Sequence, residues 1–186
     1  MSSRQLPAES KLEQARRHYI QALAETMNMY GLSPSMGLLY GIMFFRDKPM
    51  TLDEMCAQSG MSKTSMSTGV RELARLRLVH KKWEKGVRKD LYQAEQDLFR
   101  AFREFFTHLW SQEIELCTKG LATTEQEIRA LLESGDLSPE DVKQAEADLE
   151  KLRHAKDYYD WLSDLTKAMD SGQLMKYFMS SPVPEE

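Results

Sequence analysis

Short hydroxyl and basic side chains lie on one side of segment 62–77 when it is drawn as a helix. Met66, Val70, Leu73 and Leu76 recur at spacings of 4, 3 and 3 residues, which predicts a buried stripe. The other side chains of this helix supply hydrogen-bond donors that can bind phosphate oxygens and base edges at close range. The candidate contact residues of this helix are Ser62, Lys63, Thr64, Ser65, Ser67, Thr68, Arg71 and Arg75. A solvated helix of another α-helical protein is the alternative interpretation.

A basic hairpin follows this helix directly, and it favours the nucleic-acid interpretation. Strands are predicted at 78–83 and 89–94, with Gly86 in the connection at 84–88. We expect the basic residues to contact phosphates or enter a minor groove, and Trp83 to pack the hairpin onto the helices. The basic candidates are Lys81, Lys82, Lys85, Arg88 and Lys89.

The charge of the chain is divided unevenly along the sequence. The 186 residues carry a net charge of −4, which by itself disfavours nucleic acid. Residues 1–95 contain 15 Lys+Arg and 10 Asp+Glu, net +5, whereas residues 96–186 contain 10 and 19, net −9. Residues 61–90 alone contain 9 basic and 3 acidic residues, net +6. A polyanion is therefore attracted to the first half and repelled by the second.

The elements around the contact helix follow the order of a winged helix-turn-helix. Helices are predicted from Lys11 to Tyr30 and from Ser33, an N-cap followed by proline, to about Arg46. A capping box at 51–54 begins a short helix that ends at Gly60. A glycine inside a helix lowers its stability by about 1 kcal/mol relative to alanine, so its presence at position 69 calls for a reason. We predict that a neighbouring helix approaches closely at Gly69. This order allows one helix to enter the major groove of DNA beside a hairpin.

The second half of the chain is predicted to be helical throughout. Apolar residues recur at helical spacing from about Gln96, the helix weakens near Gly120, and Ser138-Pro139 begins a long charged helix. The fold is therefore mainly α with a small β-hairpin wing and long C-terminal dimerisation helices. We expect a winged helix-turn-helix domain at 11–95, a helical dimerisation and effector region at 96–180, and flexible termini at 1–10 and 181–186.

Three segments, 32–45, 52–79 and 81–95, resemble the MarR superfamily of bacterial transcriptional regulators, and more closely its GbsR-type branch. The resemblance covers residues 15–110, and the longer acidic C-terminal region departs from typical MarR proteins. It implies a dimeric repressor of genes for osmoprotectant uptake or glycine betaine synthesis, in some members responsive to choline. It also assigns Lys85 and Arg88 to a wing, and six of the helix residues to a recognition helix: Lys63, Thr64, Ser65, Ser67, Thr68 and Arg71.

Aromatic residues offer a place for such an effector. Quaternary ammonium groups bind to aromatic faces through cation–π attraction, although an aromatic stripe is also typical of a core. The rings favoured as an effector site flank the proposed DNA-binding unit, and they are Tyr40, Phe44, Phe45, Phe106 and Trp110.

Other classes of function find little support in the sequence. No apolar run approaches the roughly 20 residues of a membrane span, and the N-terminus lacks a secretory signal, so we expect a cytoplasmic protein. Metal sites, cofactor motifs and catalytic arrangements are not recognisable, and we expect neither a cofactor nor an enzyme. Two alternatives remain open: a redox regulator acting through Cys56 or Cys117, and a winged-helix protein-interaction module.

Overall fold

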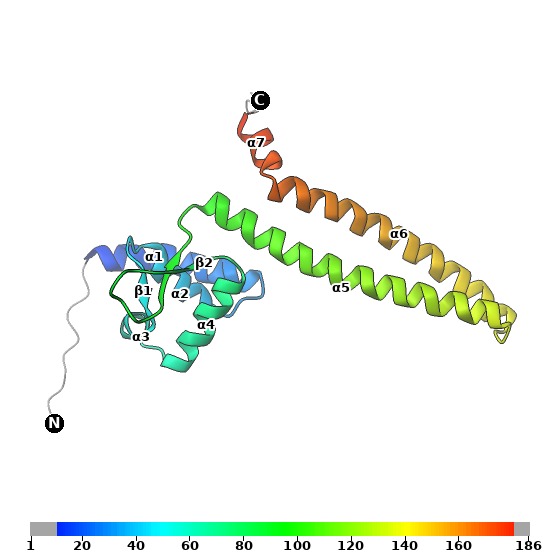
Figure 1. Ribbon diagram of the computed structural model, residues 1–186, viewed down its shortest axis with the longest axis horizontal. Coiled ribbons are helices and arrows are strands. Elements are labelled where there is room, and N and C mark those ends of the chain that lie inside the picture. Colours follow the sequence, from blue (N-terminus) through cyan, green and yellow to red (C-terminus); the bar gives the residue numbers. More distant parts are fainter. Residues whose placement is uncertain (1–10, 181–186) are drawn as a thin grey trace. The chain divides into compact units, whose positions relative to one another are not determined.

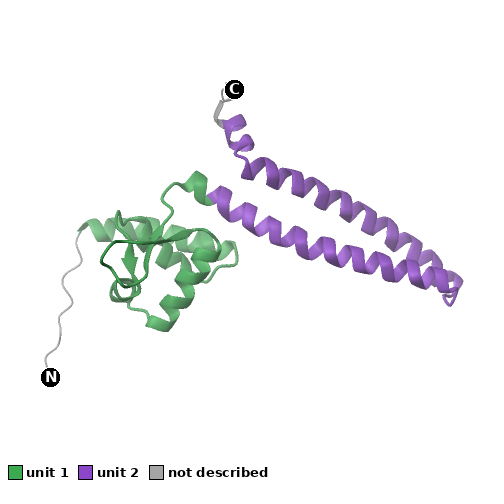
Figure 2. Cartoon of the chain, in the orientation of Figure 1, with its two compact units in different colours: residues 1–101 green, residues 102–186 purple. Residues whose placement is uncertain are grey.

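The computed structural model describes residues 11–180. The chain divides into two compact units, residues 1–101 and residues 102–186 (Figure 2). The predicted flexible termini, 1–10 and 181–186, lie outside the described residues. None of the helices within 11–180 combines the length and apolarity needed to cross a membrane.

Within residues 11–101, the first unit contains four complete helices and a small sheet, in the predicted order (Figure 1). The elements are α1 (Lys11–Met29), α2 (Pro34–Phe44), β1 (Met50–Thr51), α3 (Leu52–Ser59), α4 (Lys63–Arg75), β2 (Val79–Lys82) and β3 (Leu91–Ala94). The predicted caps are confirmed: Ser33 caps α2, Thr51 and Glu54 form the capping box of α3, and Ser62 caps α4. Each cap side chain satisfies a backbone N–H that the first helical turn leaves unpaired.

Helix α4 ends two residues earlier than predicted, and the reason is a turn at Arg77. This residue adopts a φ of +60°, the left-handed conformation that ends a helix. The N–H of Leu78 then donates to the carbonyl of Leu73 at 2.9 Å and closes the end of the helix. The chain thereby turns directly from α4 into β2.

The sheet has three antiparallel strands in the order β1-β3-β2, one strand more than the sequence predicted. Strand β1 is only two residues long and pairs Met50 with Tyr92 and Thr51 with Leu91. Two residues are too few to display the alternation by which a strand is recognised. The β2–β3 ladder runs from the pair Val79–Ala94 to the pair Lys82–Leu91, beyond which the hairpin is unpaired.

The core of this unit contains the stripe predicted on α4. Met66, Val70 and Leu73 are fully buried, and Leu76 nearly so. They pack in a core that also includes Leu39, Tyr40 and Met43 of α2 and Met55 of α3. Burial of each large apolar side chain contributes about 1.5–3 kcal/mol relative to exposure.

The close helix approach occurs at α1 and α2, not at Gly69 as predicted. A Cβ atom on Gly37 would lie 2.5 Å from the Cα atom of Ala24, and one on Gly41 would lie 2.9 Å from Cγ2 of Ile20. At Gly69 the nearest atom to such a Cβ is Cδ2 of Leu39 at 3.6 Å, an ordinary contact. The side chains of α2 keep its backbone away from α4.

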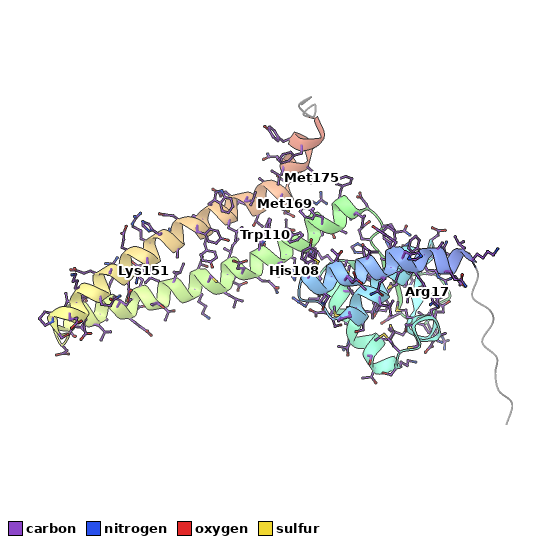
Figure 3. All side chains as sticks on the ribbon, turned by 180° about the vertical axis from the view of Figure 1, so that it is seen from behind. Arg17, His108, Trp110, Lys151, Met169 and Met175 are labelled. Carbon is purple, nitrogen blue, oxygen red and sulfur yellow. The ribbon has the colours of Figure 1, made fainter. Side chains whose placement is uncertain are left out.

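The second unit is a pair of long antiparallel helices followed by a short one. Helix α5 (Leu98–Ser134) begins in the first unit, and α6 (Pro139–Asp170), capped by Ser138 as predicted, runs beside it (Figures 1 and 3). Helix α7 (Gln173–Ser180) ends the described chain. The predicted weakening near Gly120 is wrong, because α5 is continuous there. One glycine costs only about 1 kcal/mol, which a helix of this length tolerates.

Gly37 of α2 and Gly69 of α4 give a matched test of this packing. Gly37→Ala should destabilise the protein by about 1–3 kcal/mol, because the added methyl meets the backbone of Ala24. Gly69→Ala should stabilise it by up to about 1 kcal/mol, because the methyl fits and the helix loses its glycine. Denaturant unfolding monitored by circular dichroism measures both changes. Equal effects of the two substitutions would contradict the packing described.

Candidate nucleic-acid interface

Helix α4 presents its polar side away from the core because its apolar stripe is buried. Lys63, Thr64, Thr68 and Arg71 are exposed, and Ser67 is half-buried. Two of the predicted hydroxyls are already engaged in the helix start: Oγ of Ser62 accepts from the N–H of Ser65 at 3.2 Å and lies 3.0 Å from its Oγ.

The two arginines of α4 differ in whether a carboxylate neutralises them. Nη2 and Nε of Arg75 donate to Glu72 at 2.6 and 2.9 Å, which raises the pKa of Arg75 and offsets its charge. Nε of Arg71 donates to the carbonyl of Ser67 at 3.0 Å. Among the described residues, no carboxylate forms an ion pair with Arg71. Its guanidinium is thus fixed at one edge and retains an uncompensated charge.

Asp53, in the first turn of α3, connects α4 to the hairpin. Its two carboxylate oxygens accept from Nζ of Lys63 at 2.8 Å and from Nζ of Lys89 at 2.7 Å. These hydrogen bonds, that of Lys63 first, lower the pKa of Asp53 to about 2. Two of the predicted contact residues therefore share one counter-ion, and three separate elements meet at it.

The basic residues of the hairpin likewise differ in whether a carboxylate pairs with them. Lys81 pairs with Asp90 at 2.8 Å. Within residues 11–180, by contrast, no acidic side chain forms an ion pair with Lys82, Lys85 or Arg88. All residues from 81 to 90 are exposed, and the tip holds one turn bond, from the N–H of Val87 to the carbonyl of Glu84 at 3.2 Å.

The prediction that Trp83 packs the hairpin onto the helices is wrong. Its side chain is 83% exposed, because the ladder ends at the pair Lys82–Leu91 and the chain leaves the sheet at Trp83. Leu91 and Tyr92 of β3 are buried and anchor the hairpin instead.

The segment after β3 makes contacts that no sequence pattern indicated. Nε2 of Gln96 donates to the carbonyls of Phe44 and Arg46, at 2.8 and 3.1 Å, at the C-terminal end of α2. Nε2 of His80 lies 3.2 Å from Oε2 of Glu95, and the hydroxyl of Tyr40 donates to the Glu95 carbonyl at 2.7 Å. These bonds fix the chain between the hairpin and the start of α5.

The candidate effector residues belong to separate clusters in the two units. In the first unit, Tyr40 is buried, which raises its pKa, whereas Phe44 and Phe45 are half-buried beside Tyr19. The guanidinium carbon of Arg16 lies 5.3 Å from the centre of the Phe45 ring. That ring already has a protein cation as partner.

In the second unit, the ring of Phe106 lies 5.5 Å from that of Trp110, between centroids, and 4.7 Å from that of Phe102. Phe106 and Trp110 are half-buried, and both belong to α5, from which Trp110 projects in Figure 3. Neighbouring rings that are only partly covered leave aromatic surface for a cation to approach.

The two cysteines are free and half-buried. A hydrogen bond between the side chains of Cys117 and Tyr159 links α5 to α6 and raises the pKa of Tyr159 to about 12. Across residues 11–180, no group of three or more His, Cys, Asp or Glu side chains is arranged to hold a metal ion.

Known proteins with similar sequences are transcriptional regulators. Residues 98–176 match the family model described as the C-terminal helical hairpin of GbsR family transcriptional regulators. The HTH-type transcriptional repressor GbsR of Bacillus subtilis (strain 168) is 40% identical over 172 residues, 92% of this chain and 94% of that protein. The HTH-type transcriptional repressor OpcR of the same organism is 36% identical over 166 residues, 89% of this chain and 90% of that protein.

A solved structure supports the fold. The crystal structure of a transcriptional regulator superposes with a TM-score of 0.52 at 16% identity, and the match covers 82% of this chain and 99% of that one. The fold expected from the sequence, mainly α with a small sheet and long C-terminal helices, is thereby confirmed. The 40% identity to GbsR over 92% of the chain, together with the family model matched by residues 98–176, establishes that the chain belongs to the GbsR family of transcriptional regulators.

Proposed function

We propose that this protein is a sequence-specific transcriptional repressor that binds duplex DNA as a homodimer, with α4 in the major groove and the β2–β3 hairpin as a wing. One observation carries the proposal: Arg71, Lys82, Lys85 and Arg88 keep uncompensated charges beside the polar side of α4. Charges that a protein does not neutralise internally are available to phosphates.

A homodimer is supported by an exposed apolar seam on α5. The seam consists of Phe102, Leu109 and Leu116, spaced seven residues apart and 45%, 38% and 73% exposed. Apolar residues at this spacing form the contact between paired helices. Two recognition helices are also needed to bind two half-sites one turn of DNA apart.

The effector that we propose is a quaternary ammonium compound such as choline, and the genes controlled are those for osmoprotectants. Phe106 and Trp110 are the favoured rings, because both are half-buried and their centroids lie 5.5 Å apart, whereas Tyr40 is buried. Cation–π attraction contributes roughly 0.5–2 kcal/mol per ring. The ligand regulates DNA binding only if it favours one conformation over another.

The charge argument predicts a change in the salt dependence of DNA binding. The double variant Arg71→Ala/Lys85→Ala should bind more weakly to the DNA upstream of its own gene, because fewer phosphates are neutralised. The slope of log K against log salt should become shallower by about 0.9 for each phosphate that the variant no longer neutralises. Fluorescence anisotropy over a range of salt concentrations measures both the affinity and the slope.

Arg129→Ala is the matched control for this experiment, because that arginine pairs with Glu125 on α5. It removes one positive charge from the second unit and should leave the slope unchanged. Salt-insensitive or absent binding by the wild type would favour a protein-interaction module.

The seam predicts the oligomeric state. Leu116→Glu should convert a dimer to a monomer, because it introduces a charge into the apolar contact between helices. Ala122→Glu introduces the same charge at an exposed position about 120° around α5 from Leu116. Light scattering after size exclusion measures the mass, and circular dichroism checks that helix content is retained. A dimer that survives Leu116→Glu contradicts the seam.

The effector proposal predicts choline binding that depends on two rings. Phe106→Ala and Trp110→Ala should each weaken choline binding by about 2- to 30-fold, which corresponds to roughly 0.5–2 kcal/mol per ring. Trp161→Ala, an exposed tryptophan on α6, is the control. Isothermal titration calorimetry measures the affinity. Release of DNA by oxidant in the wild type, but not in Cys56→Ser or Cys117→Ser, would favour a redox regulator over this effector.

A further inference from the structure

The wing carries an aromatic side chain that its own fold leaves uncovered. Trp83 is the most exposed large apolar side chain of the described residues. It follows the last pair of the ladder, Lys82–Leu91, and precedes a tip whose residues are all exposed. Nothing at this end of the hairpin can bury an indole, so the ring forgoes the apolar burial that stabilises most tryptophans.

The charges around Trp83 define what kind of partner fits. Lys82 precedes it, and Lys85 and Arg88 follow within the tip, each without a carboxylate partner in the described chain. Glu84, directly after Trp83, is the one acidic residue of 82–88, so this stretch carries a net charge of +2. The lysines at the far ends of this stretch are paired with carboxylates, Lys81 with Asp90 and Lys89 with Asp53, which also accepts from Lys63. The uncompensated positive charge of the hairpin is therefore concentrated around the indole, and it is complementary to a polyanion.

The indole offers two kinds of contact to DNA. Its flat ring can lie against deoxyribose or partly wedge between bases, as apolar side chains do in the minor groove. Its N–H is a donor only. In the minor groove, A·T pairs present acceptors only, whereas G·C pairs add the amino donor of guanine. A donor-only group therefore fits A·T and is opposed by G·C.

We propose that Trp83 contacts DNA directly, in the minor groove beside the half-site bound by α4, and selects A·T pairs at that position. The proposal rests on the proposed DNA-binding function and extends it from charge to base selection. Sequence information then comes from two elements: the side chains of α4 in the major groove and one indole in the minor groove.

The test uses the full-length protein and a duplex that the wild type selects from a random-sequence library. The A·T pairs flanking each half-site are replaced by G·C or by inosine·cytosine. Inosine·cytosine has the major-groove pattern of G·C but lacks the minor-groove amino group. The wild type should bind G·C duplexes roughly 10-fold more weakly and inosine·cytosine duplexes as tightly as A·T, which corresponds to one discriminating contact.

Two variants distinguish the contribution of the Trp83 ring to DNA binding from that of its N–H group. Trp83→Phe should lose the discrimination between A·T and G·C but keep most of the affinity, whereas Trp83→Ala should lose roughly 10-fold in affinity as well. Phe178→Ala, which removes a comparably exposed ring from α7, should behave as the wild type. Because Trp83 is exposed, none of these substitutions should change the unfolding temperature.

The remaining outcomes overturn the proposal in distinguishable ways. If the wild type selects no duplex, the DNA-binding function itself fails. If it selects one but Trp83→Ala binds as tightly as the wild type, Trp83 does not contact DNA. If inosine·cytosine is rejected like G·C, the base is distinguished in the major groove and not by Trp83. Dissociation of the oligomer in Trp83→Ala would assign the ring to a contact between protein chains.

Discussion

The burial of one side of α4 is the constraint on which the rest of the first unit depends. Met66, Val70 and Leu73 are fully enclosed, and together they contribute several kcal/mol to stability. Rotation of the helix by even one residue position would expose part of this stripe and bury a hydroxyl or a charge. The rotational position of the polar side, and so the direction of Arg71, is therefore set by the core. A surface for binding need not be stabilised by its own interactions when the opposite side of the same helix is this well fixed.

Ion pairs then decide which cations remain available. Lys63 and Lys89 share Asp53, Arg75 pairs with Glu72 and Lys81 pairs with Asp90. No carboxylate of the described residues forms an ion pair with the other basic residues of this segment, Arg71, Arg77, Lys82, Lys85 and Arg88. Exposed pairs of this kind contribute little to stability. Their effect is on the distribution of charge, because they determine which of the nine basic residues of 61–90 have a carboxylate beside them. The charge that such a surface presents depends as much on its acidic side chains as on its basic ones.

Local features of this fold could be predicted from the sequence, whereas features that join distant segments could not. The caps at Ser33, Thr51 and Ser62 and the stripe on α4 depend on residues within four positions of one another, so their patterns are visible in the chain. The pairing of Lys63 and Lys89 with Asp53, and the bonds of Gln96 to the end of α2, depend on tertiary contacts. The exposure of Trp83 depends on where a ladder ends, and the hairpin pattern does not specify that residue. Individual DNA contacts and the effector site depend on the shape of a partner as well as on this chain, so they stay predictions.

Thr51 has a consequence for how proteins of this type can diverge. It pairs with Leu91 in the sheet and is also the N-cap of α3, so sheet and helix share a residue and have no linker between them. An insertion or deletion at that junction would break a strand pair and a cap together. The tip from 84 to 90 has neither a ladder nor a core contact to preserve, so its length and composition can change at little cost. The fold therefore tolerates changes of length and sequence at the tip, whereas a change of length at Thr51 disrupts the sheet and α3 together.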